Sequence, residues 1–117
     1  MLQIRKTYTE VNPELLYAEI RDFTLRQGAV LGENKLETYT MPDESANFIS
    51  RGTLTFYAGG EVNKSGKECL WVHVVGNPRA ETKLMMDVDD KLFSKEKLAA
   101  LQADIDFIFS SFEPEEE

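Results

Sequence analysis

Cys69 and His73 are the closest that the sequence comes to a catalytic nucleophile with its general base. Both lie in one apolar segment, which predicts an extended strand. In a strand they would share a face but stand about 13 Å apart, at about 3.3 Å of rise per residue. A nucleophile and its base must lie about 3 Å apart. We therefore predict no such dyad and assign no catalytic residue.

Two short segments look like ligand-binding loops but lack the required residues. Asp87–Asp90 begins like a calcium loop, yet Leu92 stands where the loop needs glycine and Leu98 where it needs glutamate. Residues 60–67 are spaced almost like a phosphate-binding loop, but Glu68 replaces the hydroxyl residue and strands are predicted on both sides. With a single Cys and a single His, a zinc site would need mostly carboxylates. We predict neither a metal nor a cofactor.

Carboxylate chemistry stays open as an alternative. Glu37, Glu81 and Asp87 all fall on predicted strands. Their roles would depend on separation and burial, which the sequence does not fix. An acid–base enzyme that uses such groups is therefore kept beside the non-catalytic interpretation.

The charge balance limits the classes of partner. The 117 residues include 13 basic and 21 acidic side chains, for a net charge of −8. This field disfavours nucleic acid and anionic membranes. The single Cys69 suits a reducing compartment, and no apolar run approaches the roughly 20 residues of a membrane span or the core of a signal peptide. We expect a cytoplasmic protein without a membrane segment.

Local patterns predict a strand followed by a helix at the start of the chain. Apolar residues alternate with polar ones over about residues 2–10, which indicates a strand. Asn12 is a preferred N-cap residue, Pro13 suits the first helical position, and Gly28 commonly ends a helix. The helix is expected over about residues 13–27.

Turn residues then divide the chain into segments typical of an antiparallel meander. The expected turns contain Met41–Ser45, Gly59–Gly66 and Gly76–Pro78. The four predicted strands cover about residues 30–41, 47–58, 67–76 and 80–89.

A second helix is predicted over about residues 95–112. Ser94 can cap it, and Phe93 can pack against Leu98 across the cap. Its apolar stripe consists of Leu98, Leu101, Ile105, Ile108 and Phe112. Residues 1–112 are expected to form one domain, and 113–117, which are rich in glutamate, a disordered acidic tail.

The resulting order β-α-β-β-β-β-α defines an α+β fold with an antiparallel sheet and both helices on one face. This order resembles the TATA-binding-protein repeat and, with an insertion, the Bet v 1-like or helix-grip proteins. The resemblance implies a curved sheet that holds a long C-terminal helix. The helix-grip likeness would further imply a small apolar ligand between the sheet and that helix.

The alternation of the strands separates a core face from a second, unusually apolar face. The expected core face consists of Phe48, Ser50, Gly52, Leu54, Phe56, Leu70, Val72, Val74, Leu84, Met86 and Val88. The opposite face carries the predicted interaction residues Tyr39, Arg51, Tyr57, Trp71, His73 and Met85.

Because two helices on one side leave this second face uncovered, we predict a small non-catalytic binding or assembly domain. A homodimer through a two-fold contact is the first expectation. A protein partner, which the net charge suggests to be basic, is the second. Single-stranded nucleic acid stacked on Trp71 and Tyr57 beside Arg51 and Lys83 is the third, and the acidic field opposes it.

Overall fold

The computed structural model describes residues 2–40, 48–58, 67–77 and 79–112. The elements are β1 (Leu2–Thr9), α1 (Pro13–Arg26), β2 (Val30–Thr40), β3 (Phe48–Tyr57), β4 (Glu68–Gly76), β5 (Glu81–Val88), α2 (Lys95–Phe109) and a final 3-10 turn (Ser110–Phe112). The predicted order of elements is confirmed. The last helix ends earlier than predicted, because its final turn tightens into the 3-10 form. The turns expected at Met41–Ser45 and Gly59–Gly66, and the tail at 113–117, lie outside the described residues.

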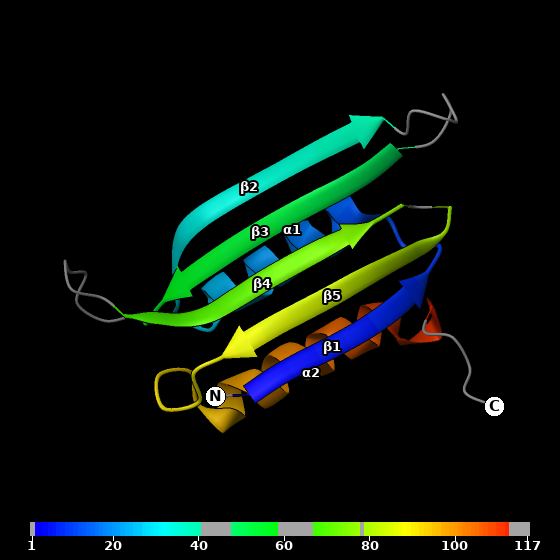
Figure 1. Cartoon of the computed structure of the whole chain (residues 1–117). Coiled ribbons are helices and arrows are strands. Elements are labelled where there is room, and N and C mark those ends of the chain that lie inside the picture. The colour runs from blue at the N-terminus through cyan, green and yellow to red at the C-terminus, as the bar shows by residue number, and fades with distance from the viewer. Residues whose placement is uncertain (1, 41–47, 59–66, 78, 113–117) are drawn as a thin grey trace.

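The five strands form a single antiparallel sheet in the order β1-β5-β4-β3-β2. Strands β2 to β5 make the predicted meander. Strand β1 joins it by pairing with β5, from Leu2 opposite Val88 to Thr9 opposite Glu81. Figure 1 shows both helices on the same side of this sheet, with α1 behind β3 and β4. The α+β class and the antiparallel sheet are thus confirmed.

Both helices begin at side-chain caps that were recognisable in the sequence. The Asn12 side chain accepts a hydrogen bond from the Glu14 backbone amide at 2.8 Å. Ser94 accepts one from the Lys97 amide at 3.2 Å. These bonds satisfy backbone donors that have no partner within the first helical turn. The caps fix where each apolar stripe starts, and therefore which side chains meet the sheet.

The core lies between the sheet and the two helices. From the strands it receives Leu54, Phe56, Leu70, Val72, Val74, Leu84, Met86 and Val88, and from α2 it receives Leu98, Leu101, Ile105 and Phe109. Tyr8 and Phe109 place their ring centroids 5.9 Å apart, so the first strand and the last helix pack directly on each other. This contact brings the two ends of the fold together at one edge of the sheet.

Two β-bulges interrupt the regular pairing. In β4, Phe56 faces Leu70 but Tyr57 faces Glu68, so Cys69 is an extra residue. In β2 the register shifts between Leu31 and Asn34. An extra residue changes the face on which neighbouring side chains lie. Both bulges therefore decide which side chains reach each face of the sheet.

Candidate functional site

The sheet face opposite the helices is the candidate site. Within the described part of the chain no helix covers it (Figure 1). Trp71, His73, Val75 and Met85 lie half-buried in its middle. His73 stands between Met85 on β5 and Thr53 on β3. We call this surface the open face.

The six predicted interaction residues do not all lie together. Arg51, Trp71, His73 and Met85 occupy the middle of the open face on three neighbouring strands. The two tyrosines lie at opposite ends of the β2–β3 pair, where Tyr39 faces Ile49 and Tyr57 faces Val30.

Each tyrosine also has a partner within the chain. Tyr39 donates a hydrogen bond to Glu37 at 2.7 Å. The Tyr57 ring packs over Gly32, where an added Cβ would lie 2.3 Å from a ring carbon. Register thus places the two tyrosine rings far apart along the β2–β3 pair, and the Tyr57 ring covers the β2 bulge. The bulge itself is held by Thr55, which accepts a hydrogen bond from the Glu33 amide at 2.7 Å.

An aromatic stack forms the centre of the open face. The Trp71 and His73 rings lie 5.5 Å apart and nearly parallel, with 3° between their planes. Thr53 Oγ1 lies 3.4 Å from His73 Nδ1. Burial lowers the pKa of His73, and the nearby positive charge of Arg51 lowers it further. The imidazole is consequently neutral at pH 7 and stacks as an uncharged ring.

Cations surround the residues beside this stack. Arg5 lies opposite Met85, whereas Lys83 and Arg51 flank Val75 from the two neighbouring strands. All three cations are exposed. Among the described residues, neither Arg5 nor Lys83 is ion-paired with a carboxylate.

A shallow depression of about 300 Å³ lies between these groups. Its lining consists of Arg5, Lys6, Thr7, His73, Val75, Lys83, Leu84 and Met85. Sequence reasoning missed Arg5 as a site residue. The alternation of β1, in which Ile4 and Tyr8 face the core, places Arg5 on the opposite side of the sheet. Which residues lie beside Arg5, however, depends on the pairing of β1 with β5.

Cys69 differs from the prediction. It was expected to share a face with His73, and this is wrong because the bulge in β4 turns Cys69 into the core. The thiol is 2% exposed, and burial raises its pKa. Cys69 and His73 thus lie on opposite sides of the sheet.

The three carboxylates of the enzyme alternative are not brought together. Glu37 lies on β2, which β3 and β4 separate from β5. Glu81 and Asp87 stand at opposite ends of β5, where Asp87 accepts a hydrogen bond from Gln3 at 3.0 Å. Within the described residues, no three His, Cys, Asp or Glu side chains are grouped so that they could hold a metal ion.

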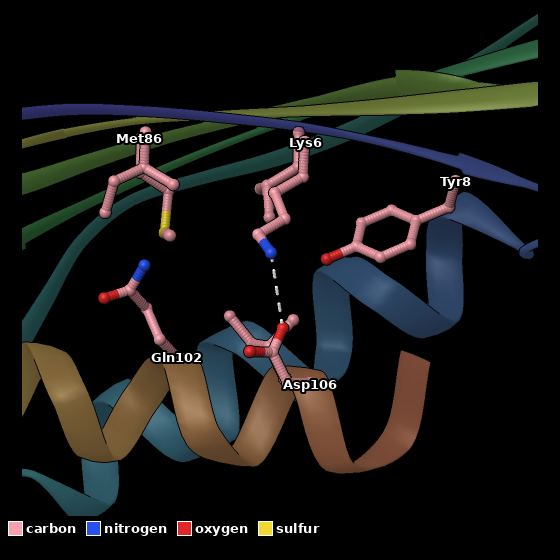
Figure 2. A pocket seen from close by; sticks show the side chains of 8 residues that line it. Lys6, Tyr8, Met86, Gln102 and Asp106 are labelled. Atoms are coloured by element: carbon pink, nitrogen blue, oxygen red, sulfur yellow. Dashed lines mark hydrogen bonds and ion pairs between the residues drawn. The ribbon is translucent and has the colours of Figure 1, made fainter. Parts of the chain in front are cut away.

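A second candidate lies on the other side of the sheet, between β1 and α2. Figure 2 shows Lys6, Tyr8 and Met86 extending from the sheet towards Gln102 and Asp106 of α2. Lys6 Nζ and Asp106 Oδ1 form an ion pair at 3.5 Å. Lys6 was not foreseen, because it occupies a position that the alternation of β1 assigns to the core face.

The hollow among these side chains has a volume of about 10 Å³. Such a space holds about one water molecule. It lies where the helix-grip resemblance would place a small apolar ligand. Binding one there would require α2 to move away from the sheet, and this alternative stays a prediction.

The pH dependence of stability tests whether the His73 imidazole is partly buried on the open face. Because its folded pKa lies below the ordinary value, the unfolded chain binds the proton more readily, so acidification below about pH 6.5 destabilises the fold. We expect the free energy of unfolding to fall from pH 7.5 to 5.5 more steeply in the wild type than in His73→Gln. Urea denaturation at several pH values measures the difference. Parallel profiles would show that the imidazole is not desolvated on the open face.

No family model matches this chain, and no curated protein is significantly similar to it in sequence. Among its described residues, neither helix is long and apolar enough to span a bilayer.

Proposed function

We propose that this chain is a non-catalytic binding or assembly domain that takes a protein partner on its open face. The observation that supports this most directly is the half-exposed group of Trp71, His73, Val75 and Met85 in the middle of a sheet whose opposite side packs on both helices. Partly exposed aromatic and methionine side chains in one patch are typical anchors of protein interfaces.

The charges on the open face help to decide which protein binds there. In a two-fold dimer whose axis passes near Val75, Arg5, Arg51 and Lys83 of one copy would approach the same cations of the other. Such like charges oppose association. A second copy of the chain stays within the proposal, but the local charges favour a different protein.

The domain would serve as a scaffold without chemistry of its own. Its order of elements resembles that of the TATA-binding-protein repeat and, with an insertion, of the helix-grip proteins, and this resemblance supports a sheet that presents one face. This likeness names no partner, since one fold hosts many functions. The proposal includes a reducing cytoplasm, which suits the free, buried thiol of Cys69.

Two adjacent methionines test whether the open face is accessible. Met85 lies half-buried on the open face, whereas Met86 is 1% exposed in the core. Brief treatment with hydrogen peroxide is expected to oxidise Met85 well before Met86, as measured by mass spectrometry of peptides. If both react equally slowly in the isolated monomer, the chain covers its own face and the proposal is wrong.

Sedimentation then separates self-association from binding of another protein. Trp71→Glu places a charge on the open face, and Phe107→Glu places one on the outer side of α2, where Phe107 is 90% exposed. A micromolar dimer that is lost only in Trp71→Glu would identify a second copy as the occupant. A monomer in all three proteins would exclude the homodimer and assign the face to another protein.

A further inference from the structure

We propose that the open face binds an acidic, extended peptide segment, with a carboxylate seated between Arg5 and Lys83. This inference rests on the proposed function and specifies the chemistry of the partner. The net charge of the chain suggested a basic partner, but the cations around the depression favour the opposite sign. Two carboxylates, Asp87 opposite Trp71 and Glu37 opposite Arg51, stand elsewhere on the same face.

Arg5 and Lys83 are placed to share one anion. Arg5 pairs with Met85 and Lys83 with Thr7, which makes the two cations diagonal neighbours on an antiparallel pair. Diagonal neighbours stand about 7–8 Å apart, within the joint reach of two long side chains. Arg5 Nε donates a hydrogen bond to Gln3 Oε1 at 3.1 Å, and the remaining guanidinium donors are the ones that a carboxylate would meet. Two like charges at this distance repel, so a carboxylate between them relieves repulsion and forms charge-assisted hydrogen bonds.

The depression supplies contacts for the rest of the segment. Its volume is about 300 Å³, and Val75 and Met85 contribute apolar surface between the cations. Arg51 stands on the far side of Val75, where it already faces Glu37 of β2, so the first carboxylate of the segment belongs to Arg5 and Lys83. The Trp71–His73 stack adjoins this surface and offers a flat apolar contact. A peptide that alternates acidic and apolar side chains matches both features.

A short acidic peptide fits the charge distribution better than nucleic acid does. A polynucleotide places a charge at every step and would pass the acidic remainder of a chain whose net charge is −8. A peptide with two or three carboxylates needs only the cations of the open face. The short ion pairs between the peptide and these cations are little affected by the acidic residues farther away, because salt screens those more distant charges.

The only tryptophan of the sequence gives the readout. Trp71 lies beside the depression, so its fluorescence reports occupation of the open face without interference from another indole. The probe is the acetylated peptide Glu-Leu-Glu-Leu-Glu, and the matched control replaces each glutamate by glutamine. We expect saturable binding of the acidic peptide that weakens as salt is added, and no binding of the control.

Single substitutions locate the site. Arg5→Gln and Lys83→Gln are each expected to weaken binding about tenfold, because each removes one charge-assisted interaction. Both side chains are exposed, so the fold is retained. Lys95→Gln, at an exposed position on α2, is the matched control and should bind like the wild type. The same titrations with Glu113, Glu115, Glu116 and Glu117 changed to Gln exclude competition from the chain's own carboxylates.

Several results would overturn the inference. These are no acidic-peptide binding in either background, equal binding of the glutamine peptide, or unchanged affinity in both Arg5→Gln and Lys83→Gln. Tighter binding of a single-stranded oligothymidine through the same two cations would assign the face to nucleic acid instead. If the peptide fails while Met85 is selectively oxidised, the open face is accessible and only its assignment to an acidic segment is wrong.

Discussion

Phe109→Ala is expected to lower the free energy of unfolding by about 3–5 kcal/mol, the usual range for removing a buried phenyl ring. Phe109 is 2% exposed, and its ring packs on Tyr8 with 5.9 Å between centroids. Its loss would leave a cavity where α2 meets β1. Urea denaturation followed by circular dichroism measures the effect.

Phe107 offers a matched control in the same helix. Its ring is 90% exposed, so Phe107→Ala removes a side chain of the same size from solvent. We expect a change below about 0.5 kcal/mol. Equal losses at the two positions would mean that α2 does not pack on the sheet through the face described here.

Gly52→Ala should destabilise the fold by about 1–3 kcal/mol through overpacking. Tyr17 of α1 and Leu36 of β2 pack so closely on Gly52 that an added Cβ would lie 2.4 Å from Tyr17 Cδ2 and 3.3 Å from Leu36 Cδ1. The Tyr17 ring is 5% exposed and has little space into which it could move. The stability difference is measured by the same denaturation experiment.

A double-mutant cycle tests this explanation. Tyr17→Leu is destabilising by itself, but it shortens the side chain that Gly52→Ala would strike. We therefore expect Gly52→Ala to cost less in the Tyr17→Leu background than in the wild type. Strict additivity would mean that the loss at Gly52 arises from something other than contact with the Tyr17 ring.

The order of the elements could be predicted because its signals are local. The Asn12 and Ser94 caps stand immediately before their helices, and alternation marks each strand within a few residues. Pairing of β1 with β5 carries no such signal, since it joins segments from the two ends of the sequence. This is why Arg5 was not recognised as a neighbour of Met85 and Lys83.

A bulge in β4 explains the error in the predicted orientation of Cys69. A strand of fixed alternation places Cys69 with His73, but one extra residue in β4 reverses the side of the sheet that Cys69 faces. At Gly32 the second bulge lets the Tyr57 ring pack on the backbone of β2. Alternation alone does not show where such an insertion falls.

The existence of an uncovered face could be predicted from the sequence, but the positions of its residues could not. The apolar content of both sides of β4 indicated an uncovered face, and its central residues Trp71, His73 and Met85 lie together. The positions of Tyr39 and Tyr57 depend on the register along the strands, which the sequence does not specify. The positive charge around the depression also depends on strand pairing, because Arg5 and Lys83 come from strands that are far apart in the chain.

Pairing of the first strand with the last also constrains how the chain folds. The meander from β2 to β5 joins sequence neighbours and can form with short loops, whereas β1 must close a loop around the whole meander before it gains a partner. During synthesis β1 is made before β5 and α2, and until they follow, its edge and Tyr8 remain exposed. The pairing of β1 with β5 is therefore expected to form late, after the transition state of the meander, so substitutions in β1 should act chiefly on the rate of unfolding.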